Sequence, residues 1–183
     1  MNIIYLHGFK SSSISIKGQL LEQYCAKYPD IQVHLPDLNM PPMAAIQKIS
    51  KLIQSMDQVA LVGSSLGGFY ATYLVAQAHV PAVLINPAMR PWQLFRELFD
   101  DELPLQVHPN WRLDDSHLDQ LEGLALPTAQ DADKILVLLQ QGDEVLDYRE
   151  AQRYYNGAAL VISETQGNHA MEDFADKIPM ALQ

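Results

Sequence analysis

Short apolar runs alternate with amphipathic stretches along most of the chain, and this alternation predicts strands and helices in turn. The run Val59–Val62 is apolar at every position, which is typical of a strand buried on both faces of a parallel sheet. Elsewhere apolar residues recur at helical spacing, as at Ile46, Ile49 and Ile53. The expected strands lie at residues 2–6, 31–35, 59–62, 82–85, 134–139 and 160–162. The expected helices lie at about residues 16–28, 42–56, 69–79, 148–155 and 171–178, the last with Met171, Phe174, Ala175 and Ile178 facing the core.

Residues 89–130 interrupt the alternation. They carry short apolar patches between prolines and acids without one long period, so we expect two or three short helices that form a small cap. Strand and helix alternate through the rest of the chain, which favours an α/β fold with a mainly parallel sheet of about six strands. The length suits a single domain spanning residues 1–183, with the cap at about 89–130 as an insertion.

The stretch Gly63-Ser64-Ser65-Leu66-Gly67 follows one of the buried runs. It fits the pattern GxSxG, in which a strand turns sharply into a helix and holds one serine hydroxyl above the sheet. Small residues suit this turn because its backbone is strained and the following helix packs close to the strand. Ser65 is therefore the candidate nucleophile. The alternative is a tight strand-to-helix turn without chemistry.

A serine hydroxyl becomes a useful nucleophile when an imidazole takes its proton. His169 follows the last expected strand, where the chain order Ser, Asp, His puts the base; the alternative is a histidine that only stabilises its loop. Asp143 is the candidate acid that orients this imidazole. Asp147 is the alternative acid, although its position also suits the cap of the next helix. Glu144 is expected to face solvent.

Acyl transfer also needs two N–H donors for the oxyanion that forms on the substrate. We expect them at Leu66, which follows the nucleophile, and at Phe9, in the loop after the first strand. Other residues at strand ends or in the cap are candidates for a substrate pocket. The alternatives are that the histidine among them braces its loop and that the cap residues only hold the cap down. These pocket candidates are His7, Ser64, Asn86, Arg90 and Trp92.

The composition is that of an ordinary globular protein, with 48% hydrophobic and 19% charged residues, and no apolar run approaches the length of a membrane span. The formal net charge of −10 disfavours nucleic acid and anionic membrane surfaces as partners. Eight acids and one base, Arg112, lie between Glu97 and Glu122, giving this segment a net charge of −7. The segment is either a solvated surface insertion or the source of a field that disfavours anionic substrates.

Cofactors and compartment are constrained by what the sequence lacks. Cys25 is the single cysteine and suits core packing. The histidines form no HExxH pattern and the glycines form neither GxGxxG nor a Walker loop, so we expect no metal and no other cofactor. The chain enters a strand at Asn2 without a signal-peptide core, so a cytoplasmic protein is expected. Nothing in the pattern predicts an oligomeric state.

Five short motifs together resemble the α/β-hydrolase superfamily, and more narrowly its compact bacterial YqiA-like esterases. They are HGF (7–9), GSSLGGFYA (63–71), NPA (86–88), GDEVLDY (142–148) and GNHA (167–170). The resemblance implies a three-layer α/β-hydrolase fold and a serine esterase that acts, without a cofactor, on small-molecule esters or thioesters with short to medium acyl chains. It also implies that Ser65, Asp143 and His169 form a catalytic triad, with Phe9 and Leu66 as oxyanion donors.

One departure from the superfamily pattern concerns Gly142, which directly precedes Asp143, whereas the superfamily usually has its glycine three positions earlier; this keeps Asp147 open as the acid. Two other functions also stay open. One is an acyl-CoA thioesterase, which would need a local positive patch from Lys10, Lys17 or Arg90. The other is a non-catalytic protein that binds a small ligand on a hydrolase fold, against which a complete triad weighs.

Overall fold

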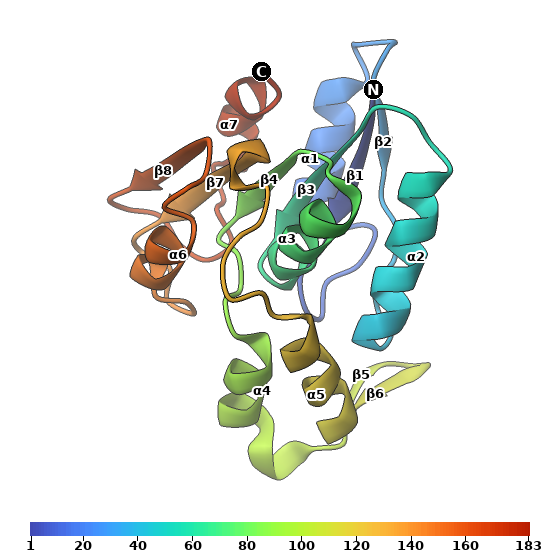
Figure 1. Ribbon diagram of the computed structural model, residues 1–183, viewed down its shortest axis with the longest axis vertical. Coiled ribbons are helices and arrows are strands. Elements are labelled where there is room, and N and C mark those ends of the chain that lie inside the picture. Colours follow the sequence, from blue (N-terminus) through green and yellow to red (C-terminus); the bar gives the residue numbers. More distant parts are fainter.

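A six-stranded sheet forms the centre of the molecule. The computed structural model describes residues 1–183, and every neighbouring pair of strands in the order β2-β1-β3-β4-β7-β8 is parallel (Figure 1). This confirms the predicted α/β class and the mainly parallel sheet. The strands are β1 (Asn2–Leu6), β2 (Gln32–His34), β3 (Val59–Ser64), β4 (Ala82–Ile85), β7 (Ile135–Gln140) and β8 (Leu160–Glu164).

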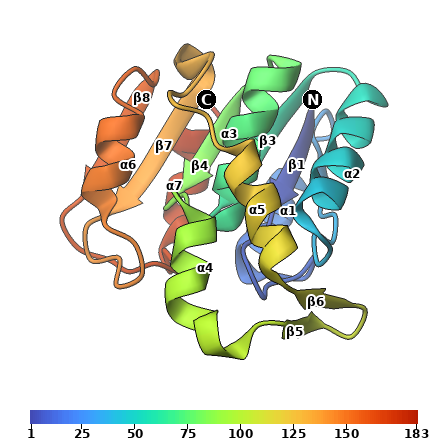
Figure 2. The ribbon, with the colours of Figure 1, turned by 60° about the horizontal axis from the view of Figure 1, so that its bottom comes forward.

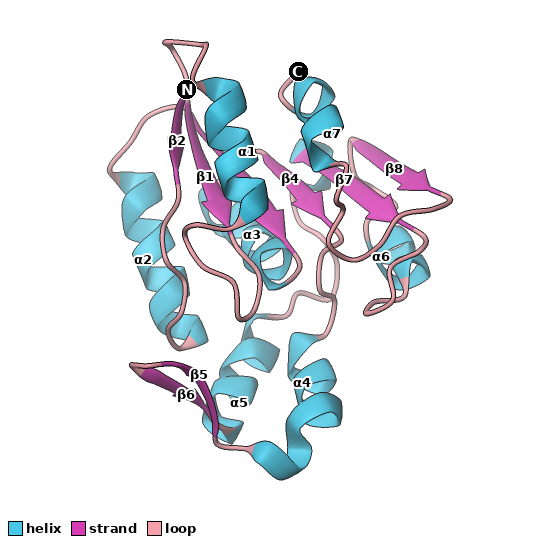
Figure 3. Cartoon of the chain, turned by 180° about the vertical axis from the view of Figure 1, so that it is seen from behind, coloured by secondary structure: helices cyan, strands magenta, loops and turns pink.

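Helices cover both faces of this sheet, giving three layers. From behind, α1 and α7 lie in front of the sheet, and α2, α3 and α6 lie on its other face (Figure 3). The helices of the two layers are α1 (Ile16–Cys25), α7 (Phe174–Ala181), α2 (Pro42–Gln54), α3 (Leu66–Ala78) and α6 (Tyr148–Tyr154). No helix combines the length and the apolar character that crossing a bilayer requires.

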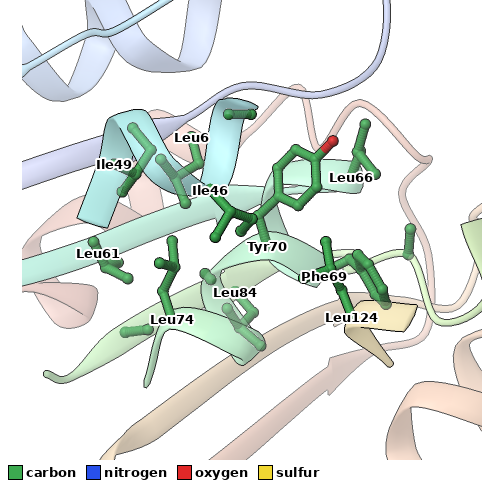
Figure 4. Packing of buried hydrophobic residues seen from close by; sticks show 14 of the residues in the cluster. Leu6, Ile46, Ile49, Leu61, Leu66, Phe69, Tyr70, Leu74, Leu84 and Leu124 are labelled. Carbon is green, nitrogen blue, oxygen red and sulfur yellow. The ribbon is translucent and has the colours of Figure 1, made fainter. Parts of the chain in front are cut away.

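The strands feed two separate cores because successive side chains point to opposite faces. In β1, Ile3 and Tyr5 belong to the core under α1 and α7, whereas Ile4 and Leu6 belong to the larger core under α2 and α3. Figure 4 shows the larger core. Burial on both faces explains why these strands are apolar at nearly every position.

The segment between β4 and β7, here called the cap segment (residues 89–130), lies beyond the end of the sheet where the strands finish (Figures 1 and 2). It contains α4 (Pro91–Phe99), a short turn η1 (Asp100–Glu102), the hairpin strands β5 (Leu105–His108) and β6 (Trp111–Leu113), and α5 (Asp115–Leu124); a second short turn, η2 (Ala132–Lys134), leads into β7. Helix α5 attaches the segment to the larger core, since Leu124 packs beside Phe69 of α3 (Figure 4).

Three details of the predicted elements are wrong. The first helix ends at Cys25 instead of continuing to residue 28, because Pro29 disfavours a helical conformation at Tyr28. Ala175 is exposed instead of facing the core, since α7 begins only at Phe174 and buries that residue and Ile178. The β5–β6 hairpin was not predicted, because strands of four and three residues leave too short a pattern.

Candidate active site

Ser65 lies at the sharp turn between β3 and α3. Its backbone has φ 53° and ψ −116°, a strained conformation for a residue with a side chain. The turn is fixed by neighbouring strands and loops, since the Ser65 N–H donates to the Ile85 carbonyl at 3.0 Å and the Ala88 N–H donates to the Ser65 carbonyl at 2.9 Å. A side chain on Gly67 would overlap the carbonyl of Leu6, so only glycine lets α3 approach β1 this closely.

A chain of hydrogen bonds runs from Ser65 through His169 to Asp143. The Ser65 Oγ lies 3.1 Å from His169 Nε2, and His169 Nδ1 lies 2.8 Å from Asp143 Oδ2. A carboxylate only accepts, so Nδ1 carries the proton and Nε2 is left to accept from the serine hydroxyl. The structure thus brings together three residues from loops that are far apart in the sequence, in the arrangement in which an imidazole takes a proton from a serine.

Asp143 is well held for orienting His169. Its side chain is 3% exposed, and its Oδ1 accepts from the backbone N–H groups of Val145 and Leu146 at 2.8 and 2.9 Å. These bonds leave Oδ2 directed at the imidazole.

The alternative acid, Asp147, is engaged elsewhere. It caps α6, accepts from the Arg149 N–H and pairs with the Arg149 side chain, each at 3.0 Å. The hydrogen bond to Arg149 is the largest cause of the lowered pKa of Asp147. Glu144 is exposed, as expected, but its Oε2 also accepts from the His169 N–H at 3.0 Å. The geometry therefore pairs His169 with Asp143 and not with Asp147.

Two buried amide side chains hold the His169 loop against the sheet. Asn86, at the end of β4, donates through Nδ2 to the carbonyls of Asn168 and His169, both at 3.1 Å, and accepts from the Gln140 N–H at 3.0 Å. Gln140, at the end of β7, accepts from the Asn168 N–H at 3.1 Å and donates to Asp173 and Glu164. Each amide is 2% exposed. Gln140 was not among the predicted site residues, although a polar residue at the end of an otherwise apolar strand is a signal for it.

The acid loop and the histidine loop also touch through their backbones. A Cβ on Gly142 would overlap the Gly167 carbonyl, so this glycine allows the two loops to meet. The Gln141 N–H donates to the Glu164 carbonyl at 2.8 Å and extends the same contact. The unusual place of Gly142, directly before Asp143, therefore has a steric reason.

The two N–H groups expected to bind an oxyanion are free of protein acceptors. Neither the Phe9 N–H nor the Leu66 N–H donates to a backbone or side-chain oxygen. Leu66 is the first residue of α3, where intrahelical acceptors are absent by construction. His7 braces the Phe9 loop, as its Nδ1 lies 2.8 Å from the Gly8 carbonyl and its Nε2 accepts from the Leu38 N–H at 2.8 Å.

A cavity of about 520 Å³ opens at Ser65 and His169. The loop at Phe9 and helix α4 contribute apolar side chains to its lining, and Phe9 lies against Phe95 with ring centroids 4.4 Å apart. Ser64 also lines this cavity, as expected. The exposed side chains of Ile14, Ile16, Leu98 and Val145 surround its mouth.

The other candidate pocket residues lie elsewhere. His7 and Asn86 are buried in the braces already described. Arg90 and Trp92 line a separate cavity of about 270 Å³, where Arg90 pairs with Glu150 at 2.7 Å and Trp92 lies 6.0 Å from Phe69. The chain after β4 therefore lies beside α3, whose Phe69, Thr72 and Tyr73 line the same cavity. No cluster of three or more His, Cys, Asp or Glu side chains could hold a metal ion.

The sheet with helices on both faces and the strand-to-helix turn at Ser65 define the class: this is an α/β-hydrolase fold. Solved structures of similar shape span nearly the whole chain. Est1E from Butyrivibrio proteoclasticus, with ferulic acid bound, is 13% identical with a TM-score of 0.74, over 99% of this chain and 87% of that one. Alpha/beta hydrolase domain-containing protein 10 from mouse is 17% identical with a TM-score of 0.72, over 99% and 89%. A structure of the metagenome-derived lipolytic enzymes LipS and LipT is 18% identical with a TM-score of 0.71, over 99% of this chain and 91% of that one.

At these identities the likenesses establish the fold. The protein belongs to the Uncharacterised protein family (UPF0227), whose model matches residues 2–183. The resemblance to the α/β-hydrolase superfamily and its YqiA-like family, drawn from five short motifs, is therefore confirmed.

Proposed function

We propose that the protein is a serine hydrolase that cleaves carboxylic esters with short to medium acyl chains through an acyl-serine intermediate. The observation that carries this proposal is the unbroken hydrogen-bonded chain from Ser65 through His169 to Asp143. A structural serine at a tight turn has no need of an imidazole beside its hydroxyl that is itself oriented by a buried carboxylate.

The first half of the reaction forms the acyl-serine. Ser65 Oγ attacks the ester carbonyl carbon while its proton moves to His169 Nε2. Asp143 keeps the proton on Nδ1 and stabilises the imidazolium that results. His169 then gives the Nε2 proton to the departing alkoxide, so that the alcohol leaves neutral. In the second half, water attacks the acyl-serine with His169 again as base, and the carboxylic acid is released.

The negative charge that develops on the carbonyl oxygen needs donors that are already in place. The unpaired N–H groups of Phe9 and Leu66 suit this role. Each such donor contributes on the order of 3 kcal/mol of transition-state stabilisation. The two hydrogen bonds of the His7 ring hold the Phe9 loop in position, so this loop does not need to move during the reaction.

The cavity supports a modest acyl group. Its apolar wall contains Leu94, Phe95 and Phe99, and its mouth is open to solvent. A thioester carbonyl would react through the same steps, so acyl-CoA hydrolysis remains the neighbouring alternative in the same class. Esters and thioesters that share one acyl group, compared by kcat/KM, separate the two.

The proposal is tested by the reaction of the protein with a fluorophosphonate probe, followed by intact-protein mass. We expect a single adduct on the wild type and none on Ser65→Ala. The matched control is Ser55→Ala, because Ser55 is exposed at the end of α2, before β3 begins, whereas Ser65 follows the opposite end of β3.

Thermal melting of both variants separates loss of chemistry from loss of fold. An adduct that persists in Ser65→Ala would overturn the assignment of the nucleophile. No adduct on folded wild type would favour the non-catalytic binding protein instead.

A further inference from the structure

The residues that line the cavity at Ser65 differ in charge from the rest of the protein. The chain carries a formal net charge of −10, and the segment from Glu97 to Glu122 alone contributes −7. No carboxylate lines the cavity, however, and Lys17 is the only lysine or arginine among its 17 lining residues. None of the acids of that segment reaches the cavity wall, so they act on the cavity only through their screened long-range field.

Lys17 has no partner of its own. Its ammonium group is half-buried, and it forms neither an ion pair nor a hydrogen bond with any protein group. Burial is the single cause that lowers the pKa of Lys17, with no carboxylate nearby to oppose it. A partly desolvated cation without a counter-charge is unfavourable. An anion in the cavity would remove this cost.

Helix stability does not explain the lysine either. Lys17 lies in the first turn of α1, and no acid accompanies it there. The N-terminus of a helix carries a partial positive charge, so a cation is unfavourable at this position. Lys10, the other lysine near the site, differs because its Nζ lies over the ring of Phe99 at 5.2 Å.

Hydroxyl groups also line the cavity. They belong to Tyr5, to Ser15, the N-cap of α1, and to Ser64, the neighbour of Ser65. Burial raises the pKa of Tyr5 to about 12, although the two serine side chains lower it, so Tyr5 keeps its proton and can donate. The lining therefore combines one lysine and several hydroxyl-bearing residues with aromatic and aliphatic side chains.

We propose that this cavity selects esters that carry an anionic group, a carboxylate or a phosphate, and that Lys17 binds this group while Ser65 attacks the ester carbonyl. The inference rests on the proposed function, since it assigns a substrate class to the same site. Only the ester bond breaks, and water supplies the hydroxyl of the acid and the proton of the alcohol. The hydrocarbon part of the substrate lies against Phe95, Leu98 and Phe99.

The test compares matched esters on the wild type, Lys17→Met and Lys17→Arg. One pair has the charge on the acyl side: 4-nitrophenyl hemiglutarate against 4-nitrophenyl pentanoate. The other has it on the alcohol side: 3-phosphopropyl butyrate against propyl butyrate. In at least one pair we expect Lys17→Met to lower kcat/KM for the anionic ester roughly tenfold to hundredfold more than for the neutral one, the range for a lost hydrogen bond to a charged group. Lys17→Arg should restore most of the preference.

The matched control is Lys27→Met, because Lys27 lies over the Tyr24 ring at 4.1 Å, away from the cavity. This variant should leave kcat/KM unchanged for the anionic and the neutral esters. Thermal melting reports folding, and Lys17→Gln replaces Lys17→Met if the latter does not fold. Equal effects of Lys17→Met on charged and neutral esters in both pairs would overturn this inference and leave the proposed hydrolase intact. A wild type that neither cleaves any of the four esters nor reacts with the fluorophosphonate would overturn both.

Discussion

The two sides of the candidate site are built in different ways. On the sheet side, buried polar groups hold the reacting side chains: Asn86 and Gln140 fix the His169 loop, and two backbone N–H groups fix Asp143. On the cap side, contact is made through apolar side chains, above all the Phe9–Phe95 pair and the leucines of α5. Hydrogen bonds are directional and apolar contacts are not.

This difference suggests that variants on the two sides should affect different kinetic constants. In the proposed reaction the sheet side would set the geometry of proton transfer, so its variants should change kcat. The cap side would contact the substrate equally in the ground state and the transition state, so its variants should change KM. Variants of Asp143, Gln140 and Leu98 test that difference, and a variant of Lys177 tests the stability of the sheet side.

The strongest test lies within the acid loop. Asp143→Asn should lower kcat about ten-thousandfold, because an amide no longer holds the histidine in the tautomer that accepts the serine proton. Asp147→Asn should change kcat little, because Asp147 bonds only to Arg149 and its own helix. Steady-state ester hydrolysis measures both. A larger effect for Asp147→Asn would assign the role of the acid to Asp147 instead of Asp143.

The next test removes a brace without touching a reacting group. Gln140→Met keeps the side-chain size but loses the bond to the Asn168 N–H, so His169 should be held less accurately. We expect kcat to fall about tenfold to hundredfold, as misplacements of about 1 Å do, with little change in KM. Gln141→Met is the control, since Gln141 bonds to Ser163 and not to the histidine loop. A change confined to KM would contradict the proposed difference between the two sides.

On the cap side, Leu98→Ala should raise KM about threefold to fivefold with little change in kcat. Leu98 is 56% exposed at the cavity mouth, so truncation removes roughly 1 kcal/mol of apolar contact with the substrate. Leu160→Ala is the control, being a similarly exposed leucine on β8. An effect of Leu98→Ala on kcat alone would assign the cap a part in the chemistry.

The smallest effect concerns Lys177, which pairs with the two carboxylates, Glu164 and Asp173, that accept from Gln140. Hydrogen bonds from Lys177 are the largest cause of the lowered pKa values of Glu164 and Asp173, whose ordinary values are 4.5 and 3.8. A carboxyl group whose pKa is lowered in the folded state stabilises the fold at pH values above its ordinary pKa. This contribution to stability is therefore complete at neutral pH and is lost as the pH falls below 4.5.

Lys177→Met should therefore lower the thermal midpoint at neutral pH, and the gap to the wild type should narrow on acidification. Solvent screening of the two carboxylates limits the effect to about 1 kcal/mol or less. Thermal melts of both proteins between neutral pH and pH 3 measure it. A gap that widens in acid would contradict the ion pairing.

The sequence predicted the sheet side better than the cap side, for physical reasons. Strands buried on both faces leave continuous apolar runs, and the turn around Ser65 admits only small residues, so both leave local patterns. The places of Arg90 and Trp92 depend instead on the direction in which the chain leaves β4, and they lie in a cavity beside α3 that is formed by residues from distant parts of the chain. Gln140 was missed because its role depends on contacts with Asn168 and Asp173 from distant parts of the chain.

The contact between Gly142 and Gly167 has a consequence for local unfolding. With backbone against backbone, neither loop can open without disturbing the other. The carboxylate and the imidazole should therefore belong to one cooperative unit, whose amide protons exchange with solvent at a common rate set by a single opening event. The Phe9 loop is held separately by His7 and should exchange independently. The protein would then keep its acid and base paired even while the wall of its cavity fluctuates.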